Sequence, residues 1–304
     1  MLYYIKRTFM LKEAQDSLPL DRKPQSLFIE CMIFLLVAFI CMLPQGFVSF
    51  VASFIIIMTD PAYIDMIASG NIDETALTEY TNNLLQNLPP WYMAVLLSAS
   101  GFMILGAIIY CKAIQKRSLR SVGFVKRGFI VEYLVGAAIG LLMISLPVLA
   151  SVLTGCVKIT VSKSISPLIL FIYLLAFILQ GMGEEALFRG YFMTSIARKH
   201  KIWIAIIVSS LMFSIFHTNN ASFGIIPFIN ITLFGIFAAV YMLKRGSIWG
   251  VGAIHSLWNF GQGNIFGLNV SGNGQMPSLF ISEQADFGKI LSGGDFGPEG
   301  GLGA

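Results

Sequence analysis

Long apolar runs alternate with short polar segments along most of this chain. A helix needs about 20 consecutive apolar residues to cross the hydrocarbon core of a bilayer. By this measure the sequence predicts seven spanning helices, at residues 28–58, 91–111, 129–154, 166–197, 202–218, 223–243 and 248–262. The first run contains Pro44 and Gly46, which predict a kink or a division into two shorter pieces. The pattern as a whole predicts an all-α fold, a polytopic transmembrane helical bundle.

The composition supports this prediction and argues against a soluble protein. Hydrophobic residues make up 56% of the 304 residues and charged residues only 12%, whereas a soluble domain carries about 25% charged residues. The net charge of +4 therefore gives no reason to expect nucleic acid as a partner. In a membrane protein, the side of the bilayer on which the basic residues lie is the informative quantity.

The basic residues gather in alternate loops. They precede the first span or follow the second, fourth and sixth spans, as Lys6, Arg7, Lys12, Arg22, Lys23, Lys112, Lys116, Arg117, Arg120, Lys126, Arg127, Arg198, Lys199, Lys201, Lys244 and Arg245. With seven spans all these loops fall on one side. The other side holds residues 60–90, with five acidic residues and no Lys or Arg, and the 155–165 loop, with Lys158 and Lys163. This bias predicts a multi-pass protein of the cell membrane whose N-terminus is cytoplasmic.

The same bias divides the chain into three parts. Residues 1–27 form a cytoplasmic N-terminal segment, residues 28–262 form the membrane domain, and residues 263–304 form a Gly-rich extracytoplasmic tail. The tail is rich in Gly, Asn and Ser and has no long apolar run. We therefore expect it to be irregular or partly disordered.

Three charged residues interrupt the fourth apolar run, within GMGEEALFRG. Each costs roughly 2.5–3.5 kcal/mol at the centre of a spanning helix on insertion scales. Glu185 and Arg189 are four residues apart and share a helix face in the favourable order, so this pair can largely neutralise itself. Glu184 points about 100° away and is the surplus carboxylate. This cluster is the first candidate for a functional site.

Two of the three histidines also lie in apolar runs, and one of them, His255, shares a helix face with Asn259. Glu184 lies 16 residues before the turn at His200 and His217 lies 17 after it, so an antiparallel helical hairpin places them at nearly the same depth. A carboxylate beside a neutral imidazole can take a proton from water. A second histidine with an amide can face a developing oxyanion. This set of residues suits the hydrolysis of an amide without a covalent intermediate.

Three short motifs together carry a resemblance to a known family. EEALFRG at 184–190, FSIFH at 213–217 and HSLWN at 255–259 resemble, in order and separation, the motifs of the CAAX-protease and bacteriocin-processing (CPBP, or Abi) family of intramembrane proteases. The resemblance covers about 115–262, beginning near SLRSVGF, and implies a catalytic core there that opens toward the cytoplasm. The tail sequence GGDFGPEGG resembles that of Gram-positive members, so we expect a bacterial member. Prenyl-protease members usually have eight spans, which leaves eight as the alternative to seven.

The resemblance also implies a role for each candidate residue. Glu184 would activate water with help from His217, His255 and Asn259 would form the oxyanion hole, and Glu185 and Arg189 would support the site. We therefore expect a CAAX prenyl protease-like intramembrane endopeptidase that acts on a protein or peptide substrate at the lipid bilayer. The resemblance does not indicate whether that substrate is prenylated.

Alternatives remain open for the cofactor and for the function. A metal-independent hydrolase without a cofactor is favoured, and the alternative is a zinc site made of Glu184, His217 and His255. Zinc there would use up the residues that activate water and bind the oxyanion, and no H-E-x-x-H motif is present. A non-catalytic membrane immunity or scaffold protein that retains the site is the second functional hypothesis. An ion-coupled transporter is the third, although the repeated halves typical of transporters do not appear in this sequence.

Overall fold

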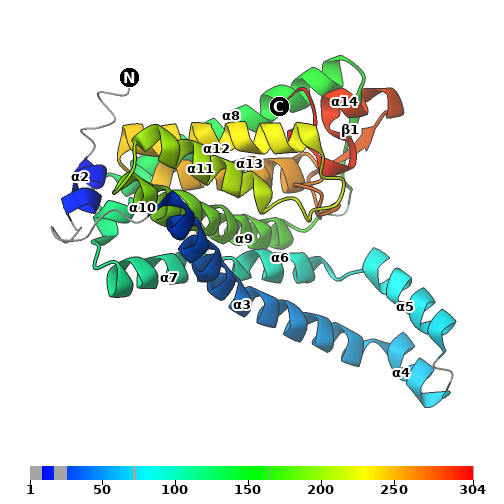
Figure 1. Cartoon of the computed structure of the whole chain (residues 1–304). Coiled ribbons are helices and arrows are strands. Elements are labelled where there is room, and N and C mark those ends of the chain that lie inside the picture. The colour runs from blue at the N-terminus through cyan, green and yellow to red at the C-terminus, as the bar shows by residue number, and fades with distance from the viewer. Residues whose placement is uncertain (1–8, 17–25, 71–72, 164, 304) are drawn as a thin grey trace.

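A computed structural model describes residues 9–16, 26–70, 73–163 and 165–303. The chain forms a bundle of helices with a small two-stranded sheet at one end (Figure 1). Five helical segments are long and apolar enough to cross a membrane, at Leu27–Thr59, Pro90–Ile114, Phe129–Leu153, Pro167–Ala197 and Ile225–Arg245. The prediction of an all-α, polytopic membrane bundle is therefore confirmed.

The other two predicted spans are present as shorter helices. Helix α11 (Ile202–Ile215) has 14 residues, and α13 (Trp249–Phe260) has 12 before it continues as the π-helical turn η4 (Gly261–Ile265). At 1.5 Å per residue they are about 21 Å and 18 Å long, less than the thickness of the hydrocarbon core. Helix α13 packs against two neighbouring helices and is buried from Gly250 to Asn259. A helix enclosed in this way need not reach both surfaces of the membrane.

The five long segments consist of the following elements: α3 (Leu27–Thr59), α6 (Pro90–Ala99), α7 (Gly101–Ile109), η1 (Tyr110–Ile114), α8 (Phe129–Leu153), α9 (Pro167–Glu185), η3 (Ala186–Met193), α10 (Thr194–Ala197) and α12 (Ile225–Arg245). Helix α3 is continuous through Pro44, so the first predicted run is one piece. Two further helices, α4 (Pro61–Ala68) and α5 (Glu74–Gln86), connect α3 to α6 and project from the bundle.

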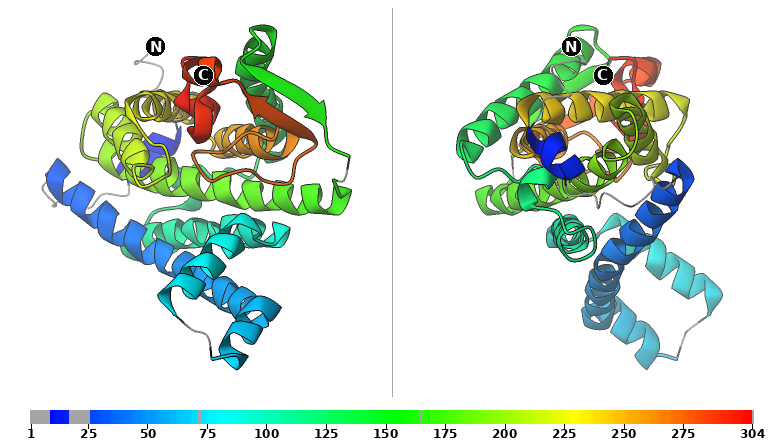
Figure 2. Two further views of the ribbon diagram at one scale, coloured as in Figure 1. Left: turned by 90° about the vertical axis from the view of Figure 1, so that its right-hand side faces the viewer. Right: turned by 60° about the vertical axis from the view of Figure 1, so that its left-hand side comes forward.

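Helix α9 lies in the middle of the bundle. Helices α6 and α7 pack on one side of it and α13 on the other, as the views in Figure 2 show. Glycines allow α8 to approach α13 closely. A Cβ atom added at Gly136 would lie 2.1 Å from the carbonyl oxygen of Gly250, and one added at Gly140 would lie 2.4 Å from that of Ile254. Small residues that permit such backbone contact are typical of helix interfaces in membranes.

The basic segments described by the structure meet at one end of the bundle. Helix α2 (Phe9–Asp16) packs against η2 (Leu119–Val122) and α10. Arg198 donates a hydrogen bond from Nε to the carbonyl oxygen of Ala14, at 3.0 Å. Helices α4 and α5 and the C-terminal tail lie at the other end (Figure 1). The basic residues Lys6, Arg7, Arg22 and Lys23 lie outside the described residues.

The tail differs from the expectation of an irregular segment. Its elements are β2 (Phe280–Gln284), η5 (Asp286–Gly288), α14 (Lys289–Ser292), η6 (Gly294–Phe296) and η7 (Pro298–Gly300). Strand β2 pairs antiparallel with β1 (Val157–Val161), and η7 packs against α8 and α12. The glycine content reflects tight turns, because many of these glycines have positive φ angles that other residues rarely adopt. The described tail, residues 263–303, contains no helix of spanning length.

Candidate active site

The two adjacent glutamates close helix α9, and the π-helical segment η3 follows them directly. Such π-helical turns occur frequently at functional sites. Glu185 and Arg189 are both fully buried, and the guanidinium Nη1 lies 3.0 Å from Glu185 Oε1. The structure therefore contains the ion pair that the sequence spacing predicts.

His255, on α13, contacts both glutamates. Its Nδ1 lies 2.9 Å from Glu185 Oε1, and its Nε2 lies 3.6 Å from Glu184 Oε2. An ionised carboxylate only accepts hydrogen bonds, so Nδ1 carries a proton that it donates to Glu185. A ring protonated on both nitrogens would direct its second N–H toward Glu184. The sequence analysis grouped His255 with Asn259, and with Glu184 in the zinc alternative, but it did not predict the hydrogen bond from His255 to Glu185.

A glutamine links the remaining oxygen of Glu184 to Asn259. Gln180 donates from Nε2 to Glu184 Oε1 at 2.7 Å, and its Oε1 accepts a hydrogen bond from Asn259 Nδ2 at 3.0 Å. Our sequence reasoning did not select Gln180. The sequence did hold a signal for Gln180: it lies four residues before Glu184 in an otherwise apolar run, so the two side chains share a helix face.

His217 follows the end of α11, and a backbone contact fixes its tautomer. Its Nδ1 lies 2.8 Å from the carbonyl oxygen of Phe213. A carbonyl only accepts, so Nδ1 carries the proton, and Nε2 of the neutral ring keeps a lone pair. Glu184 is close enough to act electrostatically on this ring. His217 therefore has an unprotonated nitrogen available as a base.

The ring of Phe213 stands among these groups. Its centroid lies 4.8 Å from that of His217 and 5.9 Å from that of His255, with edge-to-face geometry in both cases. The Arg189 guanidinium carbon lies 4.2 Å from the same centroid, within the range of a cation–π interaction. Phe213 thus packs the two histidines and the buried arginine into one cluster.

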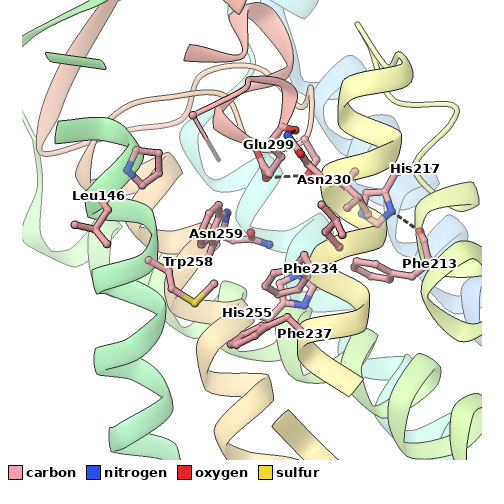
Figure 3. Close-up of a pocket in the computed structure, with 16 residues that line it drawn as sticks. Leu146, Phe213, His217, Asn230, Phe234, Phe237, His255, Trp258, Asn259 and Glu299 are labelled. Carbon is pink, nitrogen blue, oxygen red and sulfur yellow. Dashed lines mark hydrogen bonds between the residues drawn. The ribbon is translucent and has the colours of Figure 1, made fainter. Parts of the chain in front are cut away.

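The two histidines and Asn259 line a cavity of about 470 Å³ (Figure 3). Most of its wall is apolar and comes from α8, α12 and α13. The other polar residues in the wall are Asn230, Ser271 and Glu299, and the last two belong to the tail. The cavity therefore reaches the end of the bundle that holds the tail, opposite the basic end at which α2 packs. This differs from the opening toward the cytoplasm that the resemblance implied.

The zinc alternative requires Glu184, His217 and His255 to converge on one metal ion. In the described part of the chain, no group of three or more His, Cys, Asp or Glu side chains is arranged to hold a metal ion. Instead, the ring nitrogens of His255 face the two glutamates, while one nitrogen of His217 binds a backbone carbonyl. Since the hydrogen bonds of both rings occupy Nδ1 and leave Nε2, as metal-ligating histidines also do, the preference for a metal-independent site stays a prediction.

The comparison with known families decides the identity of this core. Residues 166–261 match the family model described as type II CAAX prenyl endopeptidase Rce1-like. This match, over about a third of the chain, supports the CAAX-protease and bacteriocin-processing family of intramembrane proteases for the segment 166–261. No curated protein and no solved structure gives a significant match to the chain. In a chain with several helices apolar enough to span a membrane, the match supports a CAAX-type intramembrane endopeptidase.

The matched segment runs from α9 to just beyond α13 and includes all six candidate residues of this endopeptidase. The tail residues in the cavity wall, Ser271 and Glu299, lie outside it. Nothing in the sequence singled them out, because a lone acid in a glycine-rich segment is ordinarily a solvated residue. Their position follows only from the fold of the tail.

Proposed function

We propose that this endopeptidase hydrolyses a peptide bond with a water molecule activated by Glu184 and His217, without a covalent intermediate. The observation that carries the proposal is the hydrogen bond between His217 Nδ1 and the Phe213 carbonyl. It leaves Nε2 as an acceptor on a residue that lines the cavity. A base there needs such a lone pair to take a proton from water.

In the first step, the activated water attacks the carbonyl carbon of the substrate, and Glu184 with His217 retains the proton. The carbonyl oxygen becomes negative as the new C–O bond forms. Asn259 has a second amide N–H beyond the one donated to Gln180, and this N–H is available to the oxyanion. His255 in its doubly protonated form is the second donor, through Nε2.

In the second step, the C–N bond breaks and the proton held by Glu184 and His217 passes to the leaving nitrogen. The products are a carboxylic acid and an amine, so one water is consumed and no group stays on the enzyme. Glu185 and Arg189 act indirectly. The Glu185 carboxylate holds the His255 ring by its Nδ1–H, and Arg189 balances the charge of that carboxylate.

The proposal also covers the orientation of the chain in the membrane and a reaction that uses no metal ion. The alternation of basic and acidic segments between the two ends of the bundle supports a cytoplasmic N-terminus and an extracytoplasmic tail. The substrate is a protein or peptide at the membrane. In this proposal Glu184, His217 and His255 act on the water and the oxyanion, and zinc takes no part in the mechanism.

A double-variant cycle in proteoliposomes tests the assignment of the base. Glu184→Gln and His217→Ala are each expected to lower kcat by a factor of about 10² or more, because positioned acid–base groups contribute about 10²–10⁴. If both act on the same water, the double variant loses little more than the worse single variant. If the loss of kcat in the double variant equals the product of the two single losses, Glu184 and His217 do not act on the same water. Glu79→Gln, on exposed α5, is the matched control and should behave as wild type.

A further inference from the structure

The C-terminal tail supplies a carboxylate to the wall of the proposed catalytic cavity. Glu299, on η7, is the only Asp or Glu among the described residues that line it (Figure 3). Two other tail residues, Ser271 and Gly303, also line this cavity. The segment that matches the family model ends at residue 261. The family match therefore gives Glu299 no role.

Several polar contacts hold the Glu299 carboxylate in place. Gln262 donates from Nε2 to Oε2 at 2.5 Å, and Ser271 donates from Oγ to Oε1 at 3.2 Å. Asn230, on α12, donates to the backbone carbonyl oxygens of Glu299 and Gly301, at 2.9 Å and 2.7 Å. The carboxylate is thus fixed against the membrane helices.

The glycines of the tail are required for this placement. A Cβ atom at Gly293 would lie 1.7 Å from the carbonyl oxygen of Gly297, and one at Gly297 would lie 2.0 Å from that of Asn269. Both glycines have φ angles in the left-handed region, +86° and +105°. The tail is therefore a compact fold that only glycine permits at these positions, and it presents Glu299 to the cavity.

The charges in and next to the cavity do not balance. His255, which lines the cavity, contacts Glu184 and Glu185, and it also acts electrostatically on Glu299. With His217 neutral and His255 doubly protonated, as in the proposed mechanism, these three carboxylates face two cations, Arg189 and His255, which leaves a surplus of one negative charge. The proposed reaction adds a further negative charge on the oxyanion. An ionised carboxylate in this wall repels the oxyanion and so opposes its formation, unless the charge of the carboxylate is neutralised.

The surroundings of Glu299 agree with a missing cation. Burial raises the pKa of this carboxyl, because the ionised form loses hydration, and the hydrogen bonds from Gln262 and Ser271 offset part of that effect. Apart from the histidines, the cavity wall contains no cationic side chain within the described residues. The charge of this carboxylate is therefore removed either by a proton or by a cationic group of the substrate.

We propose that Glu299 is a specificity-determining residue that binds a cationic side chain of the substrate, the ammonium group of Lys or the guanidinium of Arg, near the scissile bond. A carboxylate with fixed oxygens is well suited to either group, and Arg can be bound by both oxygens at once. This inference rests on the proposed peptidase function of the cavity, whose substrate class it narrows.

A peptide library tests the inference on many candidate sequences at once. The full chain in proteoliposomes is incubated with proteome-derived peptides made by cleavage after glutamate, which leaves Lys and Arg inside the peptides. New termini are identified by mass spectrometry, with Glu184→Gln as background. We expect Lys and Arg to be enriched at least fivefold at one fixed position relative to the cleavage site. In Glu299→Gln the enrichment should fall below twofold, while Glu299→Asp should retain it.

Glu283→Gln is the matched control, because this tail glutamate on β2 is 67% exposed and lies outside the cavity wall. It should retain the full enrichment. Cleavage by wild type without any preference for Lys or Arg would overturn the inference alone, whatever the variants do. Two results with Glu299→Gln would also overturn the inference and assign Glu299 a structural role. One is the same preference for Lys and Arg as in wild type. The other is a lower cleavage rate for all peptides alike, with that preference kept. No cleavage above the Glu184→Gln background would overturn the peptidase proposal as well.

Discussion

Replacement of Arg189 by alanine tests the reasoning about the buried ion pair. Both partners have 0% exposed side chains, and the guanidinium makes one hydrogen bond to Glu185 and one contact with the face of Phe213. Removing one member of a buried pair typically costs about 3–5 kcal/mol, because the other charge stays buried and unpaired. His255 still donates to Glu185 in this variant. We therefore expect a loss near the lower limit, about 3 kcal/mol.

The free energy of unfolding is measured in mixed micelles as the fraction of denaturing detergent rises, followed by the fluorescence of the four tryptophans. The matched comparison is Glu185→Gln with Arg189→Met, which removes both charges and keeps an acceptor for His255. Replacing a buried pair by neutral side chains of similar size is often neutral, so this double variant should lie within about 1 kcal/mol of wild type. An Arg189→Ala protein as stable as wild type, or a double variant no better than Arg189→Ala, would refute this reasoning.

The proposed site and topology make three further predictions. Asn259→Ala should lower kcat by about 10²–10³ with little change in KM, because an oxyanion donor acts in the transition state; a change confined to KM would contradict this. Zinc chelators should leave the initial rate in proteoliposomes unchanged, whereas loss on chelation and recovery with added zinc would show a metal enzyme. Gln275→Cys, exposed in the tail, should react with an impermeant thiol reagent on intact cells, and labelling only after lysis would place the tail in the cytoplasm.

Local sequence spacing was sufficient to predict the helices and the contacts within them. The seven apolar runs corresponded to five helical segments of spanning length and to the shorter helices α11 and α13, and the spacing of four residues identified the pair of Glu185 and Arg189. Such contacts depend only on the geometry of one helix. Motif order also indicated that His217 and Glu184 belong to one site, and the two groups interact electrostatically in the structure.

Contacts between distant elements could not be predicted in the same way. The bond from His255 to Glu185 depends on how closely α13 approaches α9, where a Cβ atom at Gly181 would lie 2.6 Å from the backbone nitrogen of Ser256. The place of Glu299 depends on a glycine-rich tail whose composition also suits disorder. In both cases the decisive quantity is backbone packing, which periodicity does not encode.

The initial rate of peptide hydrolysis by Glu184→Gln, compared with wild type at equal amounts of folded protein in proteoliposomes, tests the central proposal most directly. Gln180 can still donate to the new amide oxygen, so this variant should fold and accumulate normally. We expect its rate to be lower than that of wild type by a factor of at least about 10². A folded Glu184→Gln protein that cleaves peptides at the wild-type rate would contradict a glutamate-activated water.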